Sequence, residues 1–243
     1  MIEIAAVLMI TALAAGIVQS MTGFGAAIVL MLVLPLYFSM PVAAGVSCSV
    51  CLGLTLILAW RYRKYVQWRL ILLPVACYLV TSTIAIQYAQ NISTDLLTGL
   101  FGAFLFLIAV YFFFVSNRFT IRPTPVSAMV CGALGGLCSG LFGTGGPPVV
   151  LYFIPAFDRK EDYLANTQFF FLTANIVNMI TRCIHGIYTA DLLPYSLAGF
   201  CGVLLGKQIG SKLLNHIDTA LMKKCVYAFV ALSGLLLVMK HIF

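Results

Sequence analysis

The two halves of this chain repeat one another, and the duplication constrains the fold more than any other feature. Sliding the sequence along itself by 120 residues, without a gap, superimposes glycine on glycine and proline on proline. The matches are Gly16 with Gly136, Gly23 with Gly143, Gly25 with Gly145, Pro35 with Pro155 and Pro74 with Pro194. Glycine allows backbone conformations that other residues avoid, and proline fixes one backbone angle. Matches of these two residues therefore indicate that both halves follow the same chain path. We predict two repeats, residues 1–120 and 121–243.

Composition places both repeats in a membrane. The 243 residues are 62% hydrophobic and 9% charged, with a mean hydropathy of +1.06. Soluble domains carry roughly 25% charged residues, and a spanning helix needs about 20 apolar residues. The sequence therefore predicts an all-α polytopic membrane protein, with no room for a large soluble domain.

Each repeat opens with two short apolar runs and continues with three longer ones. The short runs form predicted hairpins at 3–38 and 126–157, and the predicted spans are 42–60, 70–89, 96–115, 163–182, 191–206 and 220–239. The second arm of the first hairpin, residues 25–38, would make about 21 Å of helix, less than the roughly 30 Å hydrocarbon core. We therefore expect broken helical hairpins with glycine-rich tips, buried in protein or facing a cavity.

Basic residues give the orientation. If each hairpin enters and leaves on one side, twelve of the fourteen lysines and arginines fall on a single side, leaving only Arg182 and Lys240. The positive-inside rule favours this arrangement. An odd number of crossings per repeat then inverts the second repeat relative to the first, and both termini lie outside the cytoplasm. Inverted repeats with broken helices are typical of secondary transporters, which bind substrate near mid-membrane.

The hairpin tips are the leading candidate site. Glycine lets backbone amides approach a ligand, and the helix that follows offers free N–H groups at the positive end of its dipole. The candidates in the second tip are Ser139, Gly143, Thr144, Gly145 and Gly146; in the first they are Gln19, Ser20, Thr22, Gly23, Phe24 and Gly25. The alternative is that the glycines serve only close helix packing.

A polar stripe follows the second hairpin. Gln168, Asn175, Asn178 and Arg182 recur at spacings of 7, 3 and 4, which places them on one helical face, with Asn166 at its start. Such amides either hold helices together or line a path. For Arg182, about one turn from the end of the span, we expect the side chain to extend to the membrane interface; otherwise it attracts anions at the mouth.

The sequence gives little support for metal binding, ATP hydrolysis or nucleic-acid binding. All seven acidic residues lie in loops or at span ends, which suits an anionic substrate and leaves the coupling ion open. The eight cysteines lie in or beside apolar runs, where packing is their expected role. No phosphate-binding loop or metal-ligand spacing is present, so we expect no cofactor and no metal. The net charge of +7 resides in short loops between apolar runs, which argues against nucleic-acid binding.

Two glycine-rich motifs carry a resemblance to a known family. They read Gly16-Ile-Val-Gln-Ser-Met-Thr-Gly-Phe-Gly25 and Gly136-Leu-Cys-Ser-Gly-Leu-Phe-Gly-Thr-Gly-Gly-Pro-Pro148. With the chain length and the duplication, they resemble the sulfite exporter TauE/SafE family, also called the toluene sulfonate uptake permease family. The first motif continues with Ala26-Ala27, where the family often has glycine. The resemblance implies transport of small sulfur-containing or related organic anions, such as sulfite, sulfonates or sulfoacetate, across the bacterial inner membrane.

The leading hypothesis is a secondary transporter, not an enzyme, that holds its anion between the two tips and exposes it alternately by rocking of the repeats. The alternatives are an anion channel and a membrane thiol oxidoreductase, the latter suggested by Cys48-x-x-Cys51. The expected partners are the small anion and the lipid bilayer, with a homodimer left open.

Overall fold

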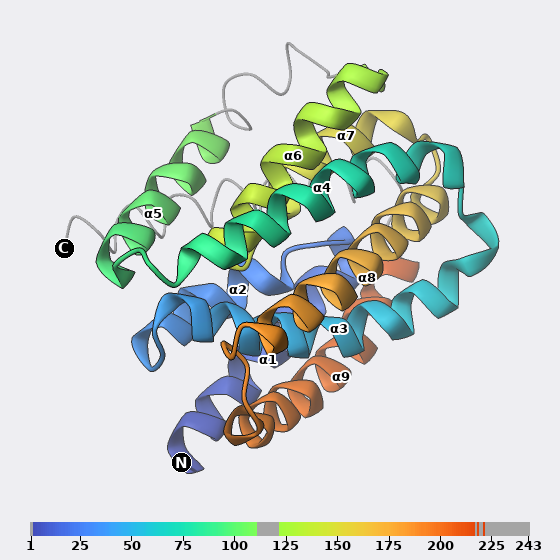
Figure 1. Ribbon diagram of the computed structural model, residues 1–243. Helices are drawn as coiled ribbons and strands as arrows, with labels where there is room; N and C mark the ends of the chain where they lie inside the picture. The colour runs from blue at the N-terminus through green and yellow to red at the C-terminus, as the bar shows by residue number, and fades with distance from the viewer. Residues whose placement is uncertain (1, 111–121, 217, 219–220, 222–243) are drawn as a thin grey trace.

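The computed structural model describes residues 2–110, 122–216, 218 and 221, and these residues fold into helices joined by short loops (Figure 1). The all-helical prediction is confirmed for this part of the chain. The predicted span 220–239, the end of the span 96–115 and the boundary at residue 120 lie outside it.

Both hairpins form, each with one long and one short arm. The first comprises α1 (Ile2–Thr22) and α2 (Ala26–Val33), extended by the short helix η1 (Leu34–Leu36). The second comprises α6 (Pro125–Phe142) and α7 (Gly146–Ala156). Helix α1 exceeds its predicted run because the polar residues that follow residue 18, from Gln19 to Thr22, remain helical. We had expected both arms of each hairpin to be short; for α1 and α6 this was wrong.

The remaining helices overlap the predicted spans, although the last of them runs nine residues past the predicted end at residue 206. They are α3 (Met40–Tyr62), α4 (Trp68–Ala89), α5 (Thr94–Val110), α8 (Lys160–Ile184) and α9 (Leu193–Asn215), with the short helices η2 (Arg63–Tyr65) and η4 (Ala190–Leu192) in two of the loops. In the described residues, α1, α3, α4, α6 and α9 are long and apolar enough to cross a membrane. Helix α8 has 25 residues, but its polar stripe makes it less apolar than these five.

The helices form three layers (Figure 1). The antiparallel pair α3 and α8 lies across the middle, between the pair α1 and α9 and the pair α4 and α6. Under the shift of 120, α3 corresponds to α8, α1 to α6 and α4 to α9. If each helix is replaced by its equivalent in the other repeat, the pair α1 and α9 becomes the pair α6 and α4. The central pair α3 and α8 becomes itself. This pattern shows that the two repeats pack in equivalent ways, and their inversion relative to a bilayer stays a prediction.

Glycines bring both outer pairs to backbone contact. A Cβ atom on Gly210 of α9 would lie 2.6 Å from the carbonyl oxygen of Ile17 on α1, and one on Gly140 of α6 would lie 2.4–3.0 Å from residues of α4. Close backbone approach through small residues at a spacing of four is a common device of membrane helices. Each outer pair joins a long hairpin arm of one repeat to a span of the other repeat.

One end of the bundle gathers basic residues. The Arg159 guanidinium lies over the Tyr65 ring at 5.7 Å, and the Lys160 Nζ donates to the carbonyl oxygen of Leu214 at 3.1 Å. The loop after α3, the start of α8 and the end of α9 therefore lie at the same end. This is the clustering on which the predicted topology depends.

Candidate functional site

Both short helices begin at a glycine tip inside the protein. Helix α2 follows Gly25 and α7 follows Gly145, and neither first turn receives a hydrogen bond from a capping side chain. Gly23, Gly25 and Gly143 have positive φ angles of 83°, 99° and 71°, a conformation that glycine adopts without a steric penalty. The first N–H groups of a helix have no partner within the helix. The two tips therefore direct uncapped helix N-termini into the interior.

A cavity of about 40 Å³ lies where the tips meet. Ten of its lining residues form five pairs under the shift of 120: Gln19 with Ser139, Phe24 with Thr144, Gly25 with Gly145, Cys51 with Phe171, and Thr55 with Asn175. The other four are Ala27, Tyr78, Gly143 and Gly146. Corresponding positions of the two repeats thus face one space, as expected for a cavity at the interface between repeats.

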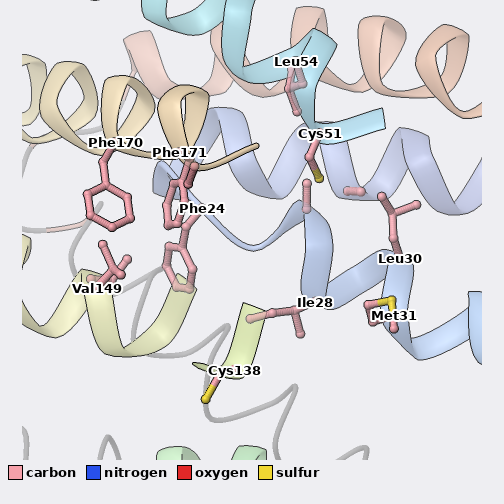
Figure 2. Close-up of a cluster of buried hydrophobic side chains, with 14 of the residues drawn as sticks. Phe24, Ile28, Leu30, Met31, Cys51, Leu54, Cys138, Val149, Phe170 and Phe171 are labelled. Carbon is pink, nitrogen blue, oxygen red and sulfur yellow. The ribbon is translucent and has the colours of Figure 1, made fainter. Parts of the chain in front are cut away.

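Four of the five pairs carry different side chains. Phe24 corresponds to Thr144, and Phe171 corresponds to Cys51. Figure 2 shows Phe24 and Phe171 close together, away from Cys51. The cavity therefore combines an aromatic wall with a wall of hydroxyl, amide and thiol groups.

Thr144 is the unsatisfied polar group of this cavity. Its side chain is 1% exposed, and its hydroxyl has no hydrogen-bond partner. In the described residues, the turn and cap hydrogen bonds use neither the Thr144 nor the Gly145 amide, whereas the Gly143 amide donates to the Ser139 carbonyl oxygen. Gly143 was predicted as an amide donor to a ligand, and its bond to Ser139 occupies that amide. A buried unpaired polar group destabilises a protein by about 1–3 kcal/mol, and among the described residues nothing satisfies the Thr144 hydroxyl.

The first tip is held by side chains from α8. Gln168 Nε2 donates to the Gly23 carbonyl oxygen at 2.6 Å, and the Tyr163 hydroxyl donates to the Thr22 carbonyl oxygen at 2.9 Å. Gln19 Nε2, on the cavity wall, donates to Gln168 Oε1 at 3.3 Å. Gln168 lies behind the cavity lining, so the structure gives it a supporting position.

Thr22 and Gly23 also belong to the framework of the tip. The Thr22 hydroxyl donates to the carbonyl oxygens of Val18 and Phe24, at 2.8 and 2.7 Å. The Gly23 amide donates to the Gln19 carbonyl oxygen at 2.9 Å. Their polar groups therefore shape the turn rather than face the cavity.

The middle of α8 faces the middle of α3 across the cavity. Asn175 Nδ2 donates to the Thr55 hydroxyl oxygen at 3.4 Å, and Cys48 Sγ lies 3.5 Å from the Asn175 carbonyl oxygen. Because Thr55 and Asn175 are equivalent positions, this hydrogen bond lies near the axis that relates the repeats. The bond from the Asn175 side-chain amide to Thr55 is long, so this amide could turn toward a ligand.

Asn178 supports the second tip from behind. Its Nδ2 donates to the Ser139 hydroxyl oxygen at 3.0 Å, and its Oδ1 accepts from the Ser82 hydroxyl at 2.8 Å. Ser139 lines the cavity and Asn178 does not. Asn178 thus orients a lining hydroxyl and connects α8 to α4 and α6.

Arg182 does not extend to the membrane interface, and that expectation was wrong. The side chain is 1% exposed. Its Nη2 donates to the carbonyl oxygens of Ser139 and Gly140, at 3.1 and 3.2 Å, and its Nη1 donates to that of Pro41 at 3.3 Å. The last turn of a helix leaves carbonyl oxygens without partners, and the guanidinium, directed inward, satisfies those of α6.

Two predicted residues lie away from the cavity. Asn166 joins the start of α8 to the loop before α4, where its Oδ1 accepts from the Gln67 amide at 2.7 Å and its Nδ2 donates to the Asp162 carbonyl oxygen at 2.6 Å. Ser20 packs against Gly210 of α9. The structure gives both residues positions in helix packing.

Several cavity residues escaped the sequence analysis. Tyr78, Cys51, Thr55, Phe171 and Ala27 line the cavity but were not candidates. The duplication carried a usable signal for Thr55, because it aligns with Asn175. Tyr78 reaches the cavity from α4 through helix packing, which the sequence pattern does not encode.

The described residues show how possible metal ligands, cysteines and carboxylates are placed. They contain no group of three histidine, cysteine or acidic residues placed to hold a metal ion. Their cysteines are free. None of their carboxylates is buried, and none lines the cavity. The polar wall thus consists of neutral donors, with Arg182 behind it.

Comparison with known proteins gives one match. The family model described as "Sulfite exporter TauE/SafE" matches residues 8–237, nearly the whole chain. No curated protein and no solved structure matches it. The two glycine-rich motifs, the duplication and the hairpin tips all lie inside the matched range. The chain is a multi-pass membrane protein of the sulfite exporter TauE/SafE family.

Proposed function

We propose that this protein is a secondary transporter that binds a small oxyanion, of the sulfite or sulfonate class, in the cavity between the hairpin tips. The proposal rests on one observation at the second tip. There the Thr144 hydroxyl, which has no hydrogen-bond partner among the described residues, and the uncapped start of α7 face the same cavity. Helix N-termini attract anions through their N–H groups and dipole. The absence of carboxylates from the lining, within the described residues, removes the main source of repulsion.

The ligand contacts follow from the geometry. An oxyanion oxygen accepts from the Thr144 hydroxyl and from the amides of Gly145 and Gly146. Ser139 and Asn175 supply further donors on the polar wall. The aromatic wall of Phe24 and Phe171 accommodates the organic part of a sulfonate. Gln168, Asn178 and Arg182 support this wall rather than touch the anion.

Transport would proceed by alternating access, with the site at the interface between inverted repeats. The cavity lies on the axis between the repeats and includes residues of both tips, so a relative movement of the repeats would open it to either side. In this topology both termini are extracytoplasmic, and the protein resides in the bacterial inner membrane. We expect a reporter protein fused to the C-terminus to give a signal from outside the cytoplasm. A signal from the cytoplasm would contradict the inverted topology.

A thermal-shift screen of the purified protein tests the anion site directly. The panel contains sulfite, sulfate, thiosulfate, methanesulfonate, toluenesulfonate, acetate and chloride. A ligand at 100 times its Kd stabilises the folded state by about 2.7 kcal/mol, which gives a measurable rise in Tm. Stabilisation by sulfite or a sulfonate supports the proposal, and no response to any anion contradicts it.

A matched pair of variants locates the site. Thr144→Val removes the hydroxyl at nearly constant volume, and we expect the anion Kd to rise about tenfold or more, since hydrogen bonds to charged groups contribute about 1.5–3 kcal/mol. Thr167→Val is the control, because Thr167 is also a buried hydroxyl without a partner but does not line the cavity. Neither change should lower the Tm of the ligand-free protein. Equal binding by both variants would place the anion elsewhere.

A further inference from the structure

Arg182 is a buried charge without a counter-ion. Among the described residues it is the only charged side chain classed as buried, and the only ion pair joins Arg159 to Glu161 near the surface. The three acceptors of its guanidinium are neutral carbonyl oxygens, and its Nε has no partner. Arginine stays protonated inside proteins. Isolated burial of such a charge is strongly unfavourable, so its position needs an explanation.

The guanidinium lies directly beneath the second tip. Ser139, whose carbonyl oxygen accepts from Arg182, lines the cavity, and the same carbonyl accepts from the Gly143 amide. A single residue, Ser139, therefore separates the positive charge of Arg182 from the cavity. The guanidinium is buried, so water is largely excluded around it. Charges interact more strongly there than in water.

We propose that the transported anion is the missing counter-ion of Arg182. Arg182 is then a positioning residue, because it holds the Ser139–Gly140 turn, and its positive charge determines the selectivity for anions. This inference rests on the proposed anion site between the tips. The uncapped α7 N-terminus supplies direct donors, and Arg182 supplies the full positive charge that favours an anion over a neutral molecule of the same shape.

Gly45 allows the charge to be tested without altering Arg182. A Cβ atom on Gly45 would lie 3.9 Å from Arg182 Cδ and 3.5–3.7 Å from Tyr188, which are ordinary contacts. Gly45→Asp would place a carboxylate beside the guanidinium and provide a permanent counter-ion. Gly45→Asn adds the same shape without the charge and is the matched control.

The experiment measures the Kd of sulfite and of methanesulfonate for the purified variants. We expect Gly45→Asp to weaken binding about tenfold relative to Gly45→Asn, because the carboxylate neutralises the charge that the anion requires. Equal Kd values for the two variants would overturn the inference. If wild-type protein binds neither anion, the proposed function fails together with the inference; if wild type binds and the two variants agree, only the inference fails.

A second comparison covers the case in which neither Gly45 variant folds. Arg182→Lys keeps the charge but loses the planar fork of donors, whereas Arg182→Gln keeps amide donors and loses the charge. If charge is decisive, the lysine variant binds methanesulfonate about tenfold more tightly than the glutamine variant. If Arg182 only braces the turn, the glutamine variant binds as well as the lysine variant or better, which would refute a charge role.

Discussion

The two hairpin tips occupy equivalent positions yet are held in different ways. In the first tip, consecutive carbonyl oxygens of Thr22, Gly23 and Phe24 all accept from side-chain donors. In the second tip, the Thr144 hydroxyl has no partner, and the nearest support lies one turn back, where Arg182 and Asn178 hold the end of α6. The duplicated motif also differs in backbone, since Gly25 has a φ of 99° and the equivalent Gly145 has a φ of −113°. Side chains hold the first tip as a framework, whereas the second tip keeps an unpaired hydroxyl, which is why we place the proposed anion there.

The glycines at the tips give the largest expected difference. A Cβ atom on Gly143 would lie 2.9 Å from the Cα atom of Ala44, whereas one on Gly23 would meet only side-chain atoms of Tyr163 and Leu164. Gly143→Ala should therefore abolish transport and destabilise the protein by about 2–4 kcal/mol, through the positive φ and overpacking. Gly23→Ala should be milder, because side chains can move.

Thermal unfolding and transport assays in vesicles measure this difference. Gly102→Ala serves as the control, because Gly102 lies within α5 and no atom of the described residues lies within 4 Å of an added Cβ. There, alanine should stabilise the helix by about 0.5–1 kcal/mol and leave transport intact. If Gly23→Ala proved more damaging than Gly143→Ala, the comparison of the tips would be reversed.

Gln168 gives the next largest effect and separates stability from binding. Gln168→Met keeps the volume but leaves the Gly23 carbonyl oxygen buried without its donor, so we expect a loss of about 1–3 kcal/mol in unfolding free energy. The anion-induced rise in Tm should persist, because the second tip is untouched. For Thr144→Val we expect the opposite result: unchanged stability and a weaker anion-induced rise in Tm. A Gln168→Met protein with normal stability and no anion response would show that the first tip binds the ligand.

Cys48 gives the smallest expected effect. It occupies the α3 position equivalent to Gln168, but its thiol faces the carbonyl oxygen of Asn175 rather than a tip. Cys48→Ser should change the unfolding free energy by about 1 kcal/mol or less and leave transport at the wild-type rate. The double variant Cys48→Ser, Cys138→Ser should also transport normally. Loss of transport in the double variant would revive the thiol oxidoreductase hypothesis.

The sequence predicted the parts of the fold that backbone geometry controls. Matching glycines and prolines located both hairpins, and apolar run lengths located the spans that the structure describes. Nine of the sixteen candidate site residues line the cavity: Gln19, Phe24, Gly25, Ser139, Gly143, Thr144, Gly145, Gly146 and Asn175.

The sequence could not assign roles that depend on side-chain direction. Arg182 lies near the end of α8, where extension to the interface is usual, but the packing of α8 against α3 and α4 directs it inward. Asn166 has the same residue type as Asn175 yet bonds to a loop. Helical spacing identifies a shared face, and tertiary packing decides what that face meets.

The pairing of helices also sets an order of assembly. Helix α1 leaves the ribosome long before its main packing partner α9, whose Gly202 contacts Met9 across some 190 residues of chain. At synthesis rates of about 5–20 residues per second, α1 must wait roughly 10–40 s for that partner. Helices α4 and α6, separated by a much shorter stretch of chain, can pair early. During that interval the face of α1 that packs against the glycines of α9 has no α9 to cover it, so we expect the membrane-insertion machinery to hold α1 until α9 has been made.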